Sequence, residues 1–123
     1  MQENKLLTES KEFAKNVVLL CRELKTRNVE APIRDQLLRA GTSVGANIHE
    51  AQYAQGTKDF ISKLEIALKE CNESEYWIEL LSETESLPKD EAETLQKECV
   101  DLRRMMVSSV KTLKIKHLKQ KTE

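Results

Sequence analysis

The segment Arg39–Ala51 reads Arg-Ala-Gly-Thr-Ser-Val-Gly-Ala-Asn-Ile-His-Glu-Ala, and it decides the fold predicted for this chain. Apolar residues recur along it at spacings of three and four, the pattern of one buried helix face. These positions are Leu37, Ala40, Val44, Ile48 and Ala51. Gly41 and Gly45 lie one turn apart in the same stretch, and each costs about 1 kcal/mol relative to alanine inside a helix. We therefore expect both glycines to allow the close approach of another helix backbone.

A polar stripe runs beside the two glycines and covers about 80° of the helical wheel. Its members are Arg39, Ser43, Asn47 and Glu50. We expect Asn47 and Glu50 to hydrogen-bond across helices and to fix their register more than they add stability. The alternative is a loop at residues 41–43, with Thr42 or Ser43 capping a new helix. We favour one helix, because a loop would normally reset the apolar phase.

The composition indicates a single all-α domain. A chain of 123 residues fits one domain, and only three glycines and two prolines accompany 39% hydrophobic and 33% charged residues. Few breakers and many Leu, Glu and Lys residues are typical of long helices. The chain has no run of 18 apolar residues and no basic-then-apolar signal sequence at its start. We therefore expect a cytoplasmic protein without a membrane partner.

The three cysteines predict core positions. Cys21, Cys71 and Cys99 are widely spaced and lie in phase with apolar helix faces, where a free cysteine packs as a small hydrophobe. A zinc site would need paired cysteines or histidines at short spacing. His49 does not belong to a zinc-binding helix motif. We expect no enzyme activity, and hence no catalytic residue, metal or cofactor.

Heptads and breakers predict four helices, at residues 3–26, 32–54, 58–85 and 89–117. Pro32 suits the first turn of the second helix. Gly56 is expected to cap the C-terminus of that helix, and Thr57 the N-terminus of the third. Residues 119–123 are expected to fray. Because short connections make consecutive helices antiparallel, the predicted fold is an up-down-up-down antiparallel four-helix bundle.

The third helix presents two faces. Its core face is the most regular heptad of the chain, with Phe60, Leu64, Ala67, Cys71, Ser74, Ile78 and Leu81. Roughly opposite lie Ile66, Trp77 and Leu80, which we predict to form an oligomer interface, because an exposed tryptophan with aliphatic neighbours is typical of one. The alternative is that Trp77 covers the edge of the core.

The last helix carries the clearest charge pattern. Residues 102–122 include seven lysines or arginines and no acid. On the side turned away from the core we place Arg103, Arg104, Lys111, Lys114 and Lys121. Such cations can bind the phosphates of RNA or DNA, although no aromatic residue lies nearby to stack on bases. The alternative is a solvated face with cations that favour the helix dipole.

The string Arg39-Ala40, Ser43-Val44, Asn47-Ile48 and Glu50 is followed by Asp59-Phe60, Leu64, Ile66-Ala67 and Glu73. This order resembles the small bacterial four-helix bundle proteins related to the 23S ribosomal RNA intervening-sequence proteins. Gly45 and Ala51 depart from the pattern, because proline and glycine are frequent there. The resemblance implies a homopentameric, barrel-like ring, with the polar stripe as the family's characteristic positions. It also extends to accessory proteins of diversity-generating retroelements, which pair with a reverse transcriptase.

Together these observations predict a non-enzymatic, homo-oligomeric accessory or scaffold protein that contacts RNA or DNA through its last helix. Its partners would be copies of itself, nucleic acid, or an enzyme of nucleic acids such as a reverse transcriptase. The alternative is a protein–protein interaction scaffold without nucleic acid. The two differ in salt dependence, which is steep for phosphate contacts and weak for an apolar interface.

Overall fold

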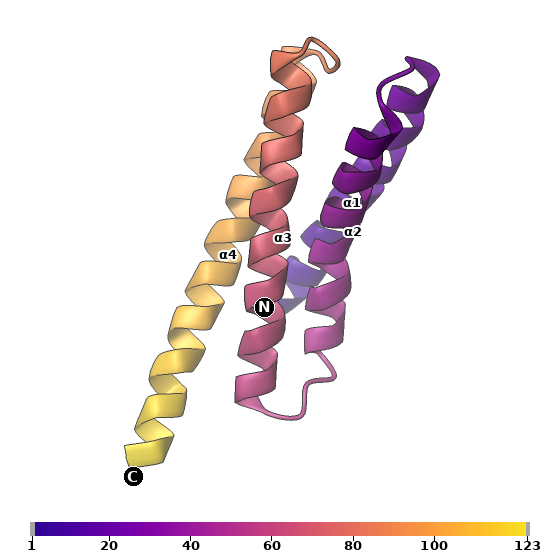
Figure 1. The fold of residues 1–123 in the computed structure, drawn as a ribbon. Helices are drawn as coiled ribbons and strands as arrows, with labels where there is room; N and C mark the ends of the chain where they lie inside the picture. The colour runs from indigo at the N-terminus through magenta and orange to yellow at the C-terminus, as the bar shows by residue number, and fades with distance from the viewer. Residues whose placement is uncertain (1, 123) are drawn as a thin grey trace.

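The computed structural model describes residues 2–122 and forms an antiparallel bundle (Figure 1). Its helices are α1 (Gln2–Thr26), α2 (Ala31–Ala51), α3 (Thr57–Glu83) and α4 (Lys89–Thr122). Consecutive helices run in opposite directions and are joined by short connections. The predicted up-down-up-down four-helix bundle is confirmed.

The second helix is continuous through Gly41 and Gly45, so the alternative of a loop at residues 41–43 is wrong. Pro32 lies in its first turn, as expected. The helix ends at Ala51, earlier than the expected residue 54, and Gln52 forms its C-terminal cap.

Gly56 begins the third helix instead of capping the second. It is the N-cap of α3 at φ 142°, and Thr57 is the first helical residue, so the capping roles expected for both residues are corrected. Glycine adopts this φ without the steric cost that a side chain would bring. The backbone N–H of Gln55 donates to Asp59 Oδ2 at 3.1 Å, which closes the turn.

The last two helices also differ from their expected bounds. The third ends at Glu83, before the expected residue 85, because Glu85 adopts a left-handed φ of 60° and turns the chain toward α4. The fourth continues past the expected residue 117 to Thr122, so the expected fraying of residues 119–122 is not observed. Lysine and glutamine, which are common in this stretch, are good helix formers. Residue 123 lies outside the described part of the chain.

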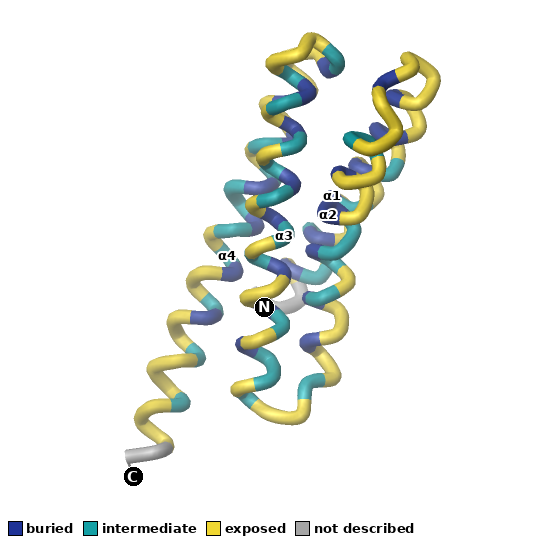
Figure 2. The backbone as a smooth tube through the Cα atoms, viewed as in Figure 1, coloured by how far each residue is buried: buried dark blue, intermediate teal, exposed yellow. Residues whose placement is uncertain are grey.

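The core is the set of apolar faces that the sequence predicts. Figure 2 shows buried positions along the inner sides of the helices and mostly exposed positions along the lower end of α4. In α2 the fully buried side chains are Leu37, Ala40, Val44 and Ile48. Ser74 and all three cysteines are buried as well, and the cysteines are unpaired thiols. The prediction of core cysteines is therefore confirmed.

The helices do not pack equally against one another. The second packs closely against both α1 and α3, and α3 packs closely against α4, whereas α1 and α4 meet over a much smaller area. Figure 1 shows the N-terminus near mid-height of the bundle and the C-terminus at its lower end. No helix between residues 2 and 122 has the length and hydropathy needed to span a bilayer.

Candidate interaction surfaces

The two glycines of α2 lie directly against α1. A methyl group added at Gly41 would come within 2.8 Å of both γ-carbons of Val17, and one at Gly45 would come within 3.2 Å of the carbonyl oxygen of Ser10. Carbon atoms that pack normally lie about 3.5–4.0 Å apart. The helix axes can therefore approach this closely only because both positions lack a side chain.

The polar stripe beside the glycines contributes one residue to the contact with α3. The guanidinium of Arg39 donates to Glu70 Oε2 at 2.6 Å and to the carboxylate of Glu73. The indole N–H of Trp77 donates to the same Glu73 carboxylate at 3.4 Å. The hydrogen bond from Arg39 holds the pKa of Glu73 below its ordinary value. The result is an ion-paired cluster that links α2 to α3.

The rest of the stripe does not make the expected contacts. The side-chain amide of Asn47 donates to the carbonyl of Ser43, one turn back in the same helix, at 2.8 Å. Glu50 is exposed at the end of α2. The interhelical hydrogen bonds predicted for Asn47 and Glu50 are therefore wrong for the described part of the chain. Asparagine readily bonds its own backbone, and Arg39 is long enough to reach α3.

The predicted interface on α3 is only partly exposed. Ile66 is exposed, whereas Trp77 and Leu80 are half-buried, and Trp77 packs against the core. The prediction of an exposed Trp77 is corrected, in line with the alternative that it covers the edge of the core. Tyr76, which the sequence analysis missed, is exposed and lies edge-on to Trp77 with ring centroids 5.0 Å apart. An interface on this side of α3 stays a prediction.

Two of the basic candidates on α4 are paired with α3. Arg103 donates to Glu75 Oε1 at 2.9 Å and also reaches the side chain of Asn72, and Lys114 donates to Glu65 Oε2 at 3.0 Å. Arg103 and Lys114 lie about three helical turns apart and so share one side of the helix. Both therefore lie on the flank of α4 next to α3, where Lys114 is exposed, as predicted, and Arg103 is half-buried.

Exposed cations and aliphatic residues share the remaining outward side of α4. Arg104 and Lys111 are exposed, as predicted, while the side chain of Lys121 lies outside the described residues. Val107, Ile115 and Leu118 are 47%, 49% and 62% exposed. We call this stripe the outer seam of α4 and define it as Val100, Arg104, Val107, Lys111, Ile115 and Leu118. The sequence analysis missed Ile115 and Leu118.

A groove rich in carboxylates runs between α1 and α4. On α1 it is lined mainly by Glu9, Glu12, Asn16, Leu19 and Glu23. On α4 it is lined mainly by Glu91, Thr94, Leu95, Glu98 and Asp101. We call it the α1–α4 groove. This groove was not predicted from the sequence, although each helix carries a pair of acidic residues three positions apart, Glu9 with Glu12 and Glu98 with Asp101.

The carboxylate of Glu98 lies at the centre of the α1–α4 groove. Its Oε1 accepts a hydrogen bond from the amide of Asn16 at 3.0 Å. Its Oε2 is buried and has no hydrogen-bond partner among the described residues. Burial, opposed by the Asn16 bond and reinforced by neighbouring acids that include Glu12 and Asp101, raises the pKa of Glu98. The pKa of Glu98 is therefore raised, whereas the pKa of Glu73, which has an arginine partner, is lowered.

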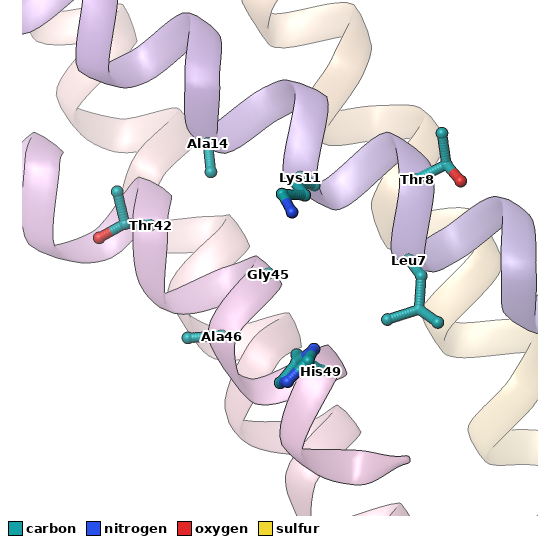
Figure 3. Close-up of a pocket in the computed structure, with 8 residues that line it drawn as sticks. All are labelled: Leu7, Thr8, Lys11, Ala14, Thr42, Gly45, Ala46 and His49. Atoms are coloured by element: carbon teal, nitrogen blue, oxygen red, sulfur yellow. The ribbon is translucent and has the colours of Figure 1, made fainter.

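A second groove lies between α1 and α2 (Figure 3). Its lining is mainly small and apolar, with Leu7, Ala14, Gly45 and Ala46, and it includes Thr8 and Thr42. Lys11 and His49 add basic groups, and none of the lining residues that the structure describes is a carboxylate. Within residues 2–122, no group of three or more histidine, cysteine or acidic side chains is arranged to hold a metal ion.

Known proteins resemble this chain in both sequence and fold. The model of the 23S rRNA-intervening sequence protein family matches residues 2–108. A crystal structure from Bacteroides thetaiotaomicron, described as a protein with unknown function from the S23 ribosomal protein family, is 42% identical with a TM-score of 0.87. The similarity covers 90% of this chain and 99% of that chain. No curated protein matches significantly.

Proposed function

The chain belongs to the 23S rRNA-intervening sequence protein family, and from this premise we propose that it is a non-enzymatic accessory or scaffold protein that works as a homo-oligomer. The observation that carries this proposal is the outer seam of α4, which exposes Val107, Ile115 and Leu118 on one helix. Single exposed aliphatic residues are common on soluble proteins. An aligned series of them on one helix is typical of a surface that another protein covers.

The side chains that could carry covalent chemistry support a non-enzymatic role. All three cysteines are buried. Burial raises the pKa of Cys21 to about 11, so its thiolate, the nucleophilic form, is scarce at neutral pH. His49 lines the groove between α1 and α2 with lysine, threonine and apolar neighbours, which include no thiol or carboxylate. That lining lacks the nucleophile–base pair that covalent catalysis requires.

Nucleic-acid binding is the second candidate function, and the exposed cations Arg104 and Lys111 favour it. They could neutralise phosphates, and an oligomer would repeat them. Arg103 and Lys114 contribute less, because each already has a carboxylate partner on α3. The aliphatic residues between the cations fit a protein partner better than a phosphate backbone. We therefore place the scaffold role first.

The decisive experiment measures mass by light scattering over a range of protein concentrations. The proposal predicts a multiple of the 14.2 kDa chain mass, with five copies as the number that the family resemblance implies. A monomer at every concentration would overturn it. Trp77→Ala tests the α3 surface in the same assay, because loss of that indole should shift the mass toward monomer if the surface is an interface.

A salt series with labelled structured RNA and a matched DNA duplex tests the second candidate. Binding that weakens steeply with salt and disappears in Arg104→Glu/Lys111→Glu would establish nucleic-acid binding. A matched control is Lys25→Glu/Lys58→Glu, which reverses two exposed cations outside α4. No binding by the wild type at low salt would exclude this function.

A further inference from the structure

We propose that the α1–α4 groove receives the outer seam of α4 from a second copy of this chain. The inference rests on the proposed function, because it presumes that copies associate, and it adds the two surfaces that meet. Much of the outer seam lies beyond residue 108, where the family match ends.

The groove has the charge and shape to accept a basic amphipathic helix. Among the residues that the structure describes, its lining includes six carboxylates and no lysine or arginine. Leu19 of α1 lies among them and is 59% exposed. On α1 the lining spans residues 9–23, which is about 21 Å of helix at 1.5 Å per residue. This length accommodates four turns of a docked helix.

The carboxylates of the groove are only weakly neutralised by their own chain. Glu9 and Glu12 pair with Lys5 and Lys15 of α1, and Glu23 pairs with Arg27 just after the helix, each at a spacing of three or four. These pairs are solvent-exposed, and exposed pairs contribute little stability. The buried Oε2 of Glu98 has no such partner among residues whose side chains are described. A cation brought by a second copy would supply the missing partner.

The outer seam of α4 has the complementary pattern. Its residues recur at spacings of three and four, which aligns them on one side of the helix. The cations Arg104 and Lys111 alternate with valine, isoleucine and leucine along 18 residue steps, which is about 27 Å. In a docked pair the cations would face the carboxylates, and the aliphatic residues would cover Leu19. The groove between α1 and α2 fits the seam less well, because Lys11 repeats the positive charge of the seam.

The two surfaces lie on different sides of α4 and come closest at Asp101 of the groove and Arg104 of the seam, which are separated by about 60° at 100° per residue. Glu98 faces α1, and Val100, two residues later, is rotated about 160° away from it at 100° per residue. A copy docked on one side of α4 therefore leaves the other side open for the next copy. Such a head-to-tail contact generates a ring when the rotation closes.

Charge reversal of each surface tests this inference. Arg104→Glu/Lys111→Glu reverses the outer seam, and Glu12→Lys/Glu23→Lys reverses the α1 side of the groove. Light scattering should report the single-chain mass of 14.2 kDa for each variant alone. An equimolar mixture should regain at least a dimer, because the unchanged groove of one variant then meets the unchanged seam of the other. Thermal unfolding checks that both variants are folded.

The outcomes separate this inference from the proposed function. A wild type that is monomeric overturns both. A wild type that is oligomeric, with both reversed variants of unchanged mass, overturns only the α1–α4 contact. Reversed variants that dissociate but do not recover on mixing also overturn it, because complementary charge is then not the cause. The control Lys25→Glu/Lys58→Glu should keep the wild-type mass.

Discussion

The contact between α2 and α3 and the α1–α4 groove differ in whether their carboxylates have a cationic partner on the neighbouring helix. At the first, Arg39 lies between Glu70 and Glu73, and the pKa of Glu73 is lowered by its arginine partner. At the second, glutamates and aspartate face one another, and burial raises the pKa of Glu98. Where α2 meets α3, the chain therefore supplies its own counter-charge, the guanidinium of Arg39. Where α1 meets α4, no ion pair between described residues of the two helices provides such a counter-charge, and a second copy of the chain would supply it.

The largest loss of stability should come from a substitution in the buried core of the bundle. Phe13 of α1 is fully buried, so Phe13→Ala should lower the free energy of unfolding by about 3–5 kcal/mol through lost burial and a cavity. The matched control is Leu19→Ala on the same helix, at an exposed position in the α1–α4 groove. Urea unfolding at concentrations low enough to keep the protein monomeric measures both. Equal losses for the two variants would contradict the distinction between the two sides of α1.

The contact between α1 and α2 should be the next most sensitive. Gly41→Ala should destabilise the protein by about 1–3 kcal/mol, because the added methyl overlaps Val17. The higher helix propensity of alanine offsets about 1 kcal/mol of that cost. In Gly41→Ala/Val17→Ala the loss should be smaller than the sum of the single losses, as thermal unfolding can measure. Additive losses would mean that the two positions are not in tight contact.

A substitution at Glu98 should change the free energy of unfolding by less, and should raise it at neutral pH. Because burial raises its pKa in the folded state, the folded protein binds this proton more tightly than the unfolded chain does. The stability contribution of Glu98 therefore rises as pH falls through the folded-state pKa and levels off below the unfolded one. Glu98→Gln should stabilise the protein at neutral pH and remove this gain at acidic pH.

The Glu98 prediction is best measured in the Arg104→Glu/Lys111→Glu background, in which the groove should stay open. The groups that face Glu98 are Asn16 and the carboxylates of Glu9, Glu12 and Asp101. Any pH dependence of the stability that remains in Glu98→Gln comes from these carboxylates. A Glu98→Gln variant that is less stable at neutral pH would show that the Glu98 carboxylate is favourably paired.

The sequence predicts this fold well because helix packing depends on local periodicity. Leu37, Val44 and Ile48 are buried where the spacing of three and four places them. Gly41 and Gly45 also indicate a close contact. Glycine destabilises a helix relative to alanine, and a close neighbouring backbone or side chain explains why it is present at both positions. These signals depend on the order of residues within one helix.

The interaction surfaces are harder to predict, because they depend on which helices are neighbours. The partner of Arg39 lies 31 residues away in Glu70, and the pairing of Arg103 with Glu75 crosses 28 residues. Neither distance follows from a helical wheel. The α1–α4 groove joins residues more than 80 positions apart, such as Asn16 and Glu98. Composition alone reports their charges and leaves their positions in space open.

The most direct test of the α1–α4 groove as an interface is the mass of Leu19→Glu in solution. This side chain is already exposed, so the variant should still fold, and its unfolding temperature should fall only by the stabilisation that association gives to the wild type. The added carboxylate would oppose an aliphatic seam inside an acidic groove, and light scattering should therefore report a single chain of 14.2 kDa. Tyr53→Glu, at an exposed position outside both surfaces, should keep the wild-type mass. A Leu19→Glu variant that keeps the mass of an oligomeric wild type would contradict the account.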